Sequence, residues 1–168
     1  METGTPIAAS QFTRTSLEVA RGAMLYALEK TPDQAMLVQL VPGGIHPTWM
    51  LGHLAVIDDE ALTWLAGVPR ALPESWHDQF GMGSTVTDEG AYPTRDELIG
   101  AMADRRAALL DWLDRAGDAD LLAPASGRIA ECAPNKMTML LQMSLHEGMH
   151  LGQLVMARRA AGLERIFG

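Results

Sequence analysis

The chain has 168 residues, a length typical of one domain that buries its own hydrophobic core. Apolar residues make up 48% and charged residues 20%, with no run near the roughly 18 apolar residues of a membrane helix, so composition excludes a disordered or membrane-spanning chain. The net charge of -8 excludes a nucleic-acid partner, and the single Cys132 together with an N-terminus lacking signal-peptide features predicts a cytoplasmic protein.

Apolar residues at helical spacing predict a first helix over residues 10–29, which Thr31 and Pro32 end. A second helix begins at Pro47, because the first turn of a helix tolerates a residue without an N–H, and it ends before Gly67. His46 belongs to the start of this helix. Residues 67–93 then form a long connection.

A third helix opens with a capping box of Thr94 and Glu97, and Gly117 is predicted to be its C-cap. The fourth begins with Asn135 as N-cap and runs to about Ala161. No run predicts a paired strand. We therefore expect one all-α domain over residues 1–168, a four-helix bundle with long crossover connections and a core at about 10–161.

The sequence HEGMH in the last predicted helix places His146 and His150 four residues apart. Residues at this spacing lie about 6 Å apart on one helix face, and both histidines fall on the apolar face. His53 lies on the flank of the apolar stripe of the second helix and can reach inward. One buried histidine is usually a neutral, hydrogen-bonded core residue, but burying several without partners is costly. The three histidines therefore predict a site for one divalent metal ion.

HEGMH also fits the H-E-x-x-H pattern of zinc proteases. Only 18 residues follow His150, none of them is a histidine, and no predicted strand can align a peptide. We therefore disfavour a protease.

Glu147 and Glu60 are the candidate catalytic carboxylates. Glu147 is either a base beside the metal, a hydrogen-bond partner of an imidazole or a solvated side chain, and Glu60 lies on the same side of its helix as His53. His77, in the long connection, is either a fourth ligand or a solvated loop residue. Cys132 is interpreted as structural.

Four segments, WMLGHLA, WHDQFGMGS, YPTRDEL and HEGMHLGQL, resemble the DinB-like (DinB/YfiT) metalloenzyme superfamily over about residues 10–161. The resemblance implies a four-helix bundle in which one histidine of the second helix and two of the last bind a divalent metal, corresponding to His53, His146 and His150. It also implies a homodimer. Related bundles act on low-molecular-weight thiols, in bacillithiol-dependent transfer and mycothiol-dependent isomerisation.

Three neutral imidazoles leave the full charge of the metal and at least one open position, where a bound thiol loses its proton near neutral pH. Zinc suits these ligands best, and nickel, iron, manganese or cobalt also fit them. We therefore expect a metal-dependent enzyme of S-transferase type that acts on a small-molecule substrate with a low-molecular-weight thiol as cosubstrate. The alternatives are a stress-related metal-binding bundle without turnover and a metal-dependent hydrolase.

Overall fold

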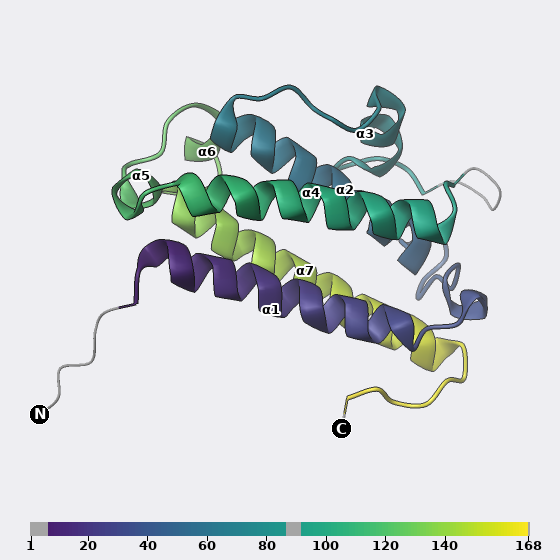
Figure 1. Cartoon of the computed structure of the whole chain (residues 1–168). Coiled ribbons are helices and arrows are strands. Elements are labelled where there is room, and N and C mark those ends of the chain that lie inside the picture. Colours follow the sequence, from purple (N-terminus) through teal and green to yellow (C-terminus); the bar gives the residue numbers. More distant parts are fainter. Residues whose placement is uncertain (1–6, 87–91, 168) are drawn as a thin grey trace, which may run out of the picture.

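A computed structural model describes residues 7–86 and 92–167, and within them the chain forms helices and no strands. The predicted all-α class is confirmed. Four long helices lie side by side (Figure 1): α1 (Ala9–Glu29), α2 (Pro47–Ala66), α4 (Arg95–Arg115) and α7 (Lys136–Ala160). No helix in the described part of the chain is long and apolar enough to cross a membrane.

The helix starts follow the predicted capping residues. The His46 Nδ1 atom accepts the backbone N–H of Trp49 at 3.2 Å, so this histidine is the N-cap of α2. Thr94 and Glu97 form the predicted capping box of α4. The Asn135 side chain accepts the N–H of Thr138 at 2.8 Å at the start of α7. These three predictions are confirmed.

The predicted C-cap at Gly117 is wrong. α4 ends at Arg115, and Gly117 has a φ of -78° instead of the left-handed conformation of a glycine C-cap. Gly117 is instead the N-cap of a short helix, α5 (Asp118–Leu122), and α6 (Gly127–Ala130) follows. The Asp118 carboxylate accepts the N–H groups of Ala9 and Ser10 at 3.0 Å, so this segment caps the start of α1, a long-range role that local glycine patterns do not reveal.

The chain direction explains the long connection between α2 and α4. The colours of Figure 1 show that α1 and α7 run in one direction and that α2 and α4 run in the other. Because α2 and α4 are parallel neighbours, the connection must return along the length of the helices. It contains a short helix, α3 (Glu74–Phe80), which packs on α2 through the fully buried Phe80 ring.

Four buried charged side chains, one from each long helix, form a single ion-pair network. Arg21 of α1 and Arg106 of α4 lie between the carboxylates of Asp58 and Glu147, from α2 and α7. Arg21 Nε lies 2.5 Å and Arg106 Nη2 2.8 Å from the Glu147 carboxylate. Each arginine also donates to a backbone carbonyl, that of Met102 or Leu17. The network pairs two positive with two negative charges, so attraction between its members offsets the free-energy cost of removing them from water.

We expect Arg106→Met to lower the free energy of unfolding by about 3–5 kcal/mol, because the change leaves two buried carboxylates with only one arginine. Urea denaturation followed by circular dichroism measures this. The control is Arg14→Met, which breaks partly exposed pairs with Glu18 and Asp114 and should cost less than about 1 kcal/mol. An equal loss of unfolding free energy in the two variants would contradict a larger stabilising role for the buried network than for the exposed pairs.

Candidate metal centre

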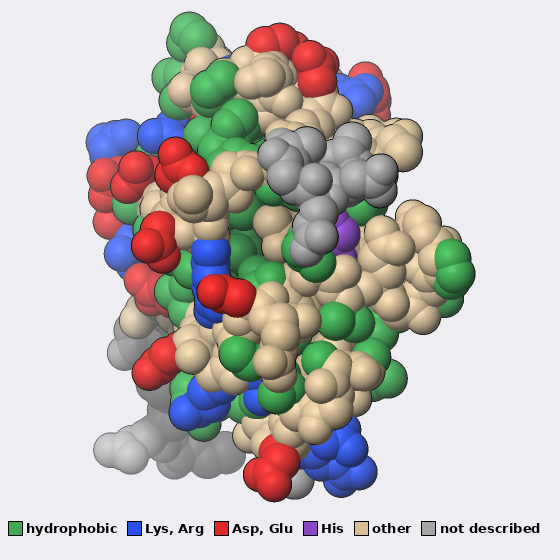
Figure 2. Space-filling model, turned by 90° about the vertical axis from the view of Figure 1, so that its right-hand side faces the viewer, with side chains coloured by type: hydrophobic (Ala, Val, Ile, Leu, Met, Phe, Trp, Pro, Cys, Tyr) green, Lys and Arg blue, Asp and Glu red, His purple; other side chains and the backbone are tan. Residues whose placement is uncertain are grey.

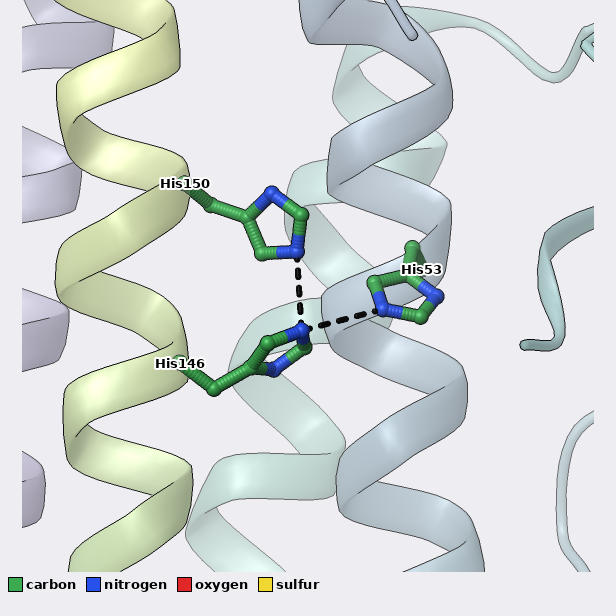
Figure 3. Close-up of side chains that lie close together, drawn as sticks. All are labelled: His53, His146 and His150. Atoms are coloured by element: carbon green, nitrogen blue, oxygen red, sulfur yellow. Dashed lines mark hydrogen bonds between the residues drawn. The ribbon is translucent and has the colours of Figure 1, made fainter. Parts of the chain in front are cut away.

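The side chains of His53, His146 and His150 converge between α2 and α7 (Figure 3). The Nε2 atom of His146 lies 3.3 Å from Nε2 of His53 and 3.0 Å from Nε2 of His150. One ligand atom from each ring lies within 4.8 Å of the others, so the three residues could hold one metal ion. Ligand nitrogens around a tetrahedral zinc, at about 2.0–2.1 Å from the ion, lie roughly 3.3 Å apart.

Two hydrogen bonds fix which nitrogen of the His53 and His150 rings faces the centre. His53 donates from Nδ1 to the backbone carbonyl of Phe80, and His150 donates from Nδ1 to Oε1 of Gln153, both at 2.7 Å. Oxygen atoms of this kind only accept, so both Nδ1 atoms carry a hydrogen. In the neutral rings, the two Nε2 atoms therefore have lone pairs directed at His146.

This arrangement fits a cation better than a set of hydrogen-bonded core histidines. A neutral His146 has at most one hydrogen on Nε2, which cannot satisfy two acceptors with good geometry. If that hydrogen is on Nδ1 instead, three lone pairs face one another. A metal ion is an electron-pair acceptor that all three nitrogens can share, and orienting the opposite ring nitrogen by a hydrogen bond is the usual arrangement around metal-bound histidines.

Burial keeps the three rings neutral near pH 7. Loss of water, together with the neighbouring imidazoles, lowers the pKa of His53 and of His150 to about 4 each, and the hydrogen bonds to Phe80 and Gln153 only partly oppose this. Burial also lowers the pKa of His146, although the carboxylates of Glu147 and Asp58 partly oppose this. Neutral imidazole is the form that binds a metal, so protons compete weakly for this site at neutral pH.

The local sequence explains how His53 obtains its partner. A Cβ atom on Gly52 would lie 2.5 Å from the Phe80 ring, so only glycine permits this ring to pack against α2. That packing brings the Phe80 carbonyl to Nδ1 of the adjacent His53. The Trp49 ring stacks on the imidazole of His53, with centroids 4.7 Å apart. Gly52 and Trp49 thus both contribute to the position of the His53 ring on α2.

Comparison with known families gives an independent assignment. The sequence model of the DinB superfamily matches residues 16–154, most of the chain and all three histidines. The chain belongs to the DinB superfamily. A comparison with curated proteins found no match.

In this DinB-superfamily chain, Glu147 is fully buried, so its interpretation as a solvated side chain is wrong. Both of its oxygens accept from arginines, Oε1 from Arg21 and Oε2 from Arg106. Glu147 therefore acts on the adjacent His146 through its charge. Its assignment as a catalytic group remains a prediction.

Glu60, the second candidate, pairs with Arg70 at 3.1 Å on the partly buried side of α2, and its catalytic role is also still a prediction. His77 is buried on α3, so its interpretation as a solvated loop residue is wrong. Its Nε2 atom lies 3.2 Å from the carboxylate of Asp59. Within the described residues, His77 is not part of the histidine cluster that could hold a metal ion. Asp59 also accepts the N–H groups of Ala71 and Leu72, so it fastens the connection to α2, a role that sequence analysis missed.

We expect Gly52→Ala to weaken metal binding at least ten-fold, because the added methyl group displaces Phe80 and removes the acceptor that orients His53. Competition titration with a chromogenic zinc chelator measures the affinity. Gly152→Ala, on α7 two residues after His150, is the matched control, since a Cβ there meets nothing within 4 Å. Unchanged affinity in folded Gly52→Ala would show that the Phe80 carbonyl does not position His53.

Proposed function

We propose that this DinB-superfamily chain is a metal-dependent enzyme of thiol chemistry, of S-transferase type, with His53, His146 and His150 as the ligands of one divalent ion. The observation that carries the proposal is the convergence of three Nε2 atoms, two of which present lone pairs because their Nδ1 atoms donate to oxygen. Zinc suits three imidazoles best, and nickel, iron, manganese or cobalt are the other candidates.

A divalent ion bound by three neutral ligands supplies an electrophile that lowers the pKa of a thiol in its open coordination position. The chain's own residues prepare that position. Phe80 and Gln153 hold the Nδ1 hydrogens of His53 and His150, and the Trp49 ring covers one face of His53. A thiol held there would release its proton to water, its sulfur would form a bond to an electrophilic carbon of the substrate, and the leaving group would depart with the electron pair of its broken bond to that carbon.

The proposal extends to the domain and its location. We take the four long helices as a four-helix bundle with long crossover connections, forming a single domain over residues 1–168. The parallel course of α2 and α4 supports this arrangement. A cytoplasmic location belongs to the same proposal, because a reducing compartment suits low-molecular-weight thiols and a chain with one exposed cysteine.

Cobalt-loaded protein tests this proposal, since thiolate coordination adds a sulfur-to-metal charge-transfer band that imidazole and water do not give. In a Cys132→Ser background, which removes the exposed protein thiol, titration with 2-mercaptoethanol near pH 7 should give a saturable band. The band and the bound cobalt should both disappear in His53→Ala, His146→Ala and His150→Ala, with the helical circular-dichroism spectrum retained.

Each other result favours a different function. Cobalt binding without a thiol-dependent band would favour a metal-binding bundle without turnover, or a hydrolase if the loaded protein cleaves esters in the absence of thiol. Full cobalt occupancy in all three alanine variants would overturn the metal site itself. Transfer of 2-mercaptoethanol to 1-chloro-2,4-dinitrobenzene, followed by product absorbance, then separates an S-transferase from a protein that only binds thiols.

We also propose that the chain forms a homodimer through the outer face of α1 and α7. Exposed apolar side chains recur there, with Val19 and Met149 at 66% exposure and Leu145 at 71%. The groove between these helices is lined only by uncharged residues. Two copies with a net charge of -8 each repel one another, and an uncharged face is where a second copy approaches with least repulsion.

Sedimentation equilibrium should therefore give twice the 18.2 kDa chain mass at micromolar concentrations. Leu145→Glu should return the protein to a monomer, because association would bury the new carboxylate. Met82→Glu introduces the same charge at another exposed apolar position and should leave the dimer intact. A wild-type protein that sediments only as 18.2 kDa would contradict the dimer.

A further inference from the structure

A cavity of about 300 Å³ lies at the end of the bundle where α2 begins and α7 ends. Its apolar wall comes from the segment after α1, from α2 and from α7, and it includes Leu40, Val41, Ile45, Met50, Leu154 and Ala157. The volume is about twice that of an apolar cavity that binds benzene, roughly 150 Å³. It is therefore large enough for a chain of about six carbons.

The cavity lies near His53 and His150, although neither of them is among its lining residues. Met50 precedes His53 by three residues, and Leu154 follows His150 by four, so both walls lie one helical turn from the ligands. Gln153 lines the cavity and also accepts the Nδ1 hydrogen of His150 at 2.7 Å. Figure 2 views this end of the bundle, where hydrophobic side chains are exposed. One residue, Gln153, thus belongs to both the cavity wall and the histidine site.

The polar groups of the wall define what the cavity accepts. The lining contains no Asp, Glu, Lys or Arg. His46 is buried with a lowered pKa, accepts the Trp49 N–H through Nδ1, and also hydrogen-bonds to the Met36 backbone. It is therefore neutral and already engaged. Because Gln153 uses Oε1 for His150, its amide N–H groups are what it offers a ligand. The wall suits an uncharged apolar chain with a hydrogen-bond acceptor at the end nearest the histidines.

We propose that this cavity binds an unbranched alkyl chain of about six carbons, the apolar part of a substrate whose polar end reaches the histidine site. The identity of the reacting group at the polar end rests on the proposed function. Binding of the alkyl chain in the cavity does not need a metal. An alkyl substituent on the thiol and one on the electrophile share this chemistry. Each methylene that moves from water into the cavity should tighten binding about four-fold.

The first test uses 1-butanol and 1-hexanol as probes of metal-free wild-type protein labelled with ¹³C at the methionine methyl groups. Met50 lines the cavity and is buried, whereas Met139 is buried near the start of α7, outside the cavity, and serves as an internal control. Hexanol should shift the Met50 signal saturably and bind about 16-fold more tightly than butanol, with Met139 unaffected. No shift at Met50, or equal shifts at both methionines, would overturn the inference.

The second test fills the cavity from its helical wall. Ala157→Leu adds three carbons at a buried lining position, and Ala160→Leu adds the same atoms at the exposed last residue of α7. Hexanol binding should be lost in the first variant and kept in the second. If Ala157→Leu does not fold, the wild-type methionine signals still decide. Equal hexanol affinity in both folded variants would overturn the inference.

Measurements on cobalt-loaded protein test this inference separately from the proposed function. They also identify which reactant carries the alkyl chain. The cobalt content and the 2-mercaptoethanol band should be unchanged in Ala157→Leu, so loss of hexanol binding with an intact band concerns the cavity alone. If hexanol displaces 1-hexanethiol from cobalt, the chain belongs to the thiol. If hexanol and 1-hexanethiol bind at the same time, the alkyl chain belongs to the electrophile. Hexanol binding without any thiol band would retain the cavity assignment and reject the thiol chemistry.

Discussion

The orientation of α7 depends on the buried carboxylate of Glu147. Two arginines from α1 and α4 hold both of its oxygens, and they also hold Asp58 of α2. Rotating α7 by one residue, about 100°, would leave a buried anion unpaired, at a cost of several kcal/mol. Because His146 immediately precedes Glu147 and His150 follows it by three residues, the same constraint directs both imidazoles toward α2 and His53. An apolar core of equal volume could match this stability, but it would fix the rotation less strictly.

The five letters HEGMH therefore have a different physical meaning here than in a zinc protease. In a protease, the glutamate of H-E-x-x-H is the general base next to the metal-bound water. In this chain that carboxylate accepts from Arg21 and Arg106, and its charge partly opposes the effect of burial on the pKa of His146. The helical spacing of the two histidines suits any metal site on a helix. The residues that pair with the glutamate decide its role.

Periodicity and capping rules were sufficient for the long helices and for the pair of His146 and His150, because both depend on residues within a few turns of one another. His53 joins that pair from another helix, 93 positions away from His146. Thr94 and Asn135 act locally, and His146 and His150 share a face at any i, i+4 spacing. The rest depends on long-range partners. The burial of Glu147 requires Arg21, which lies 126 positions away, and the burial of His77 requires Asp59 on another helix. Gly117 caps a different helix because Asp118 is needed at the start of α1.

The oxygen acceptors of the His53 and His150 Nδ1 hydrogens lie in different surroundings. The Phe80 carbonyl reaches His53 only because Gly52 leaves room for the ring, and α3 is held in place by Asp59 with its backbone and His77 partners. That side is buried. Gln153, behind His150, has an amide that also faces the apolar cavity. A ligand that accepts from this amide would alter the polarisation of the His150 hydrogen bond. Under the proposed function, occupancy of the cavity would therefore change the basicity of the His150 Nε2 atom without contacting His53 or His146.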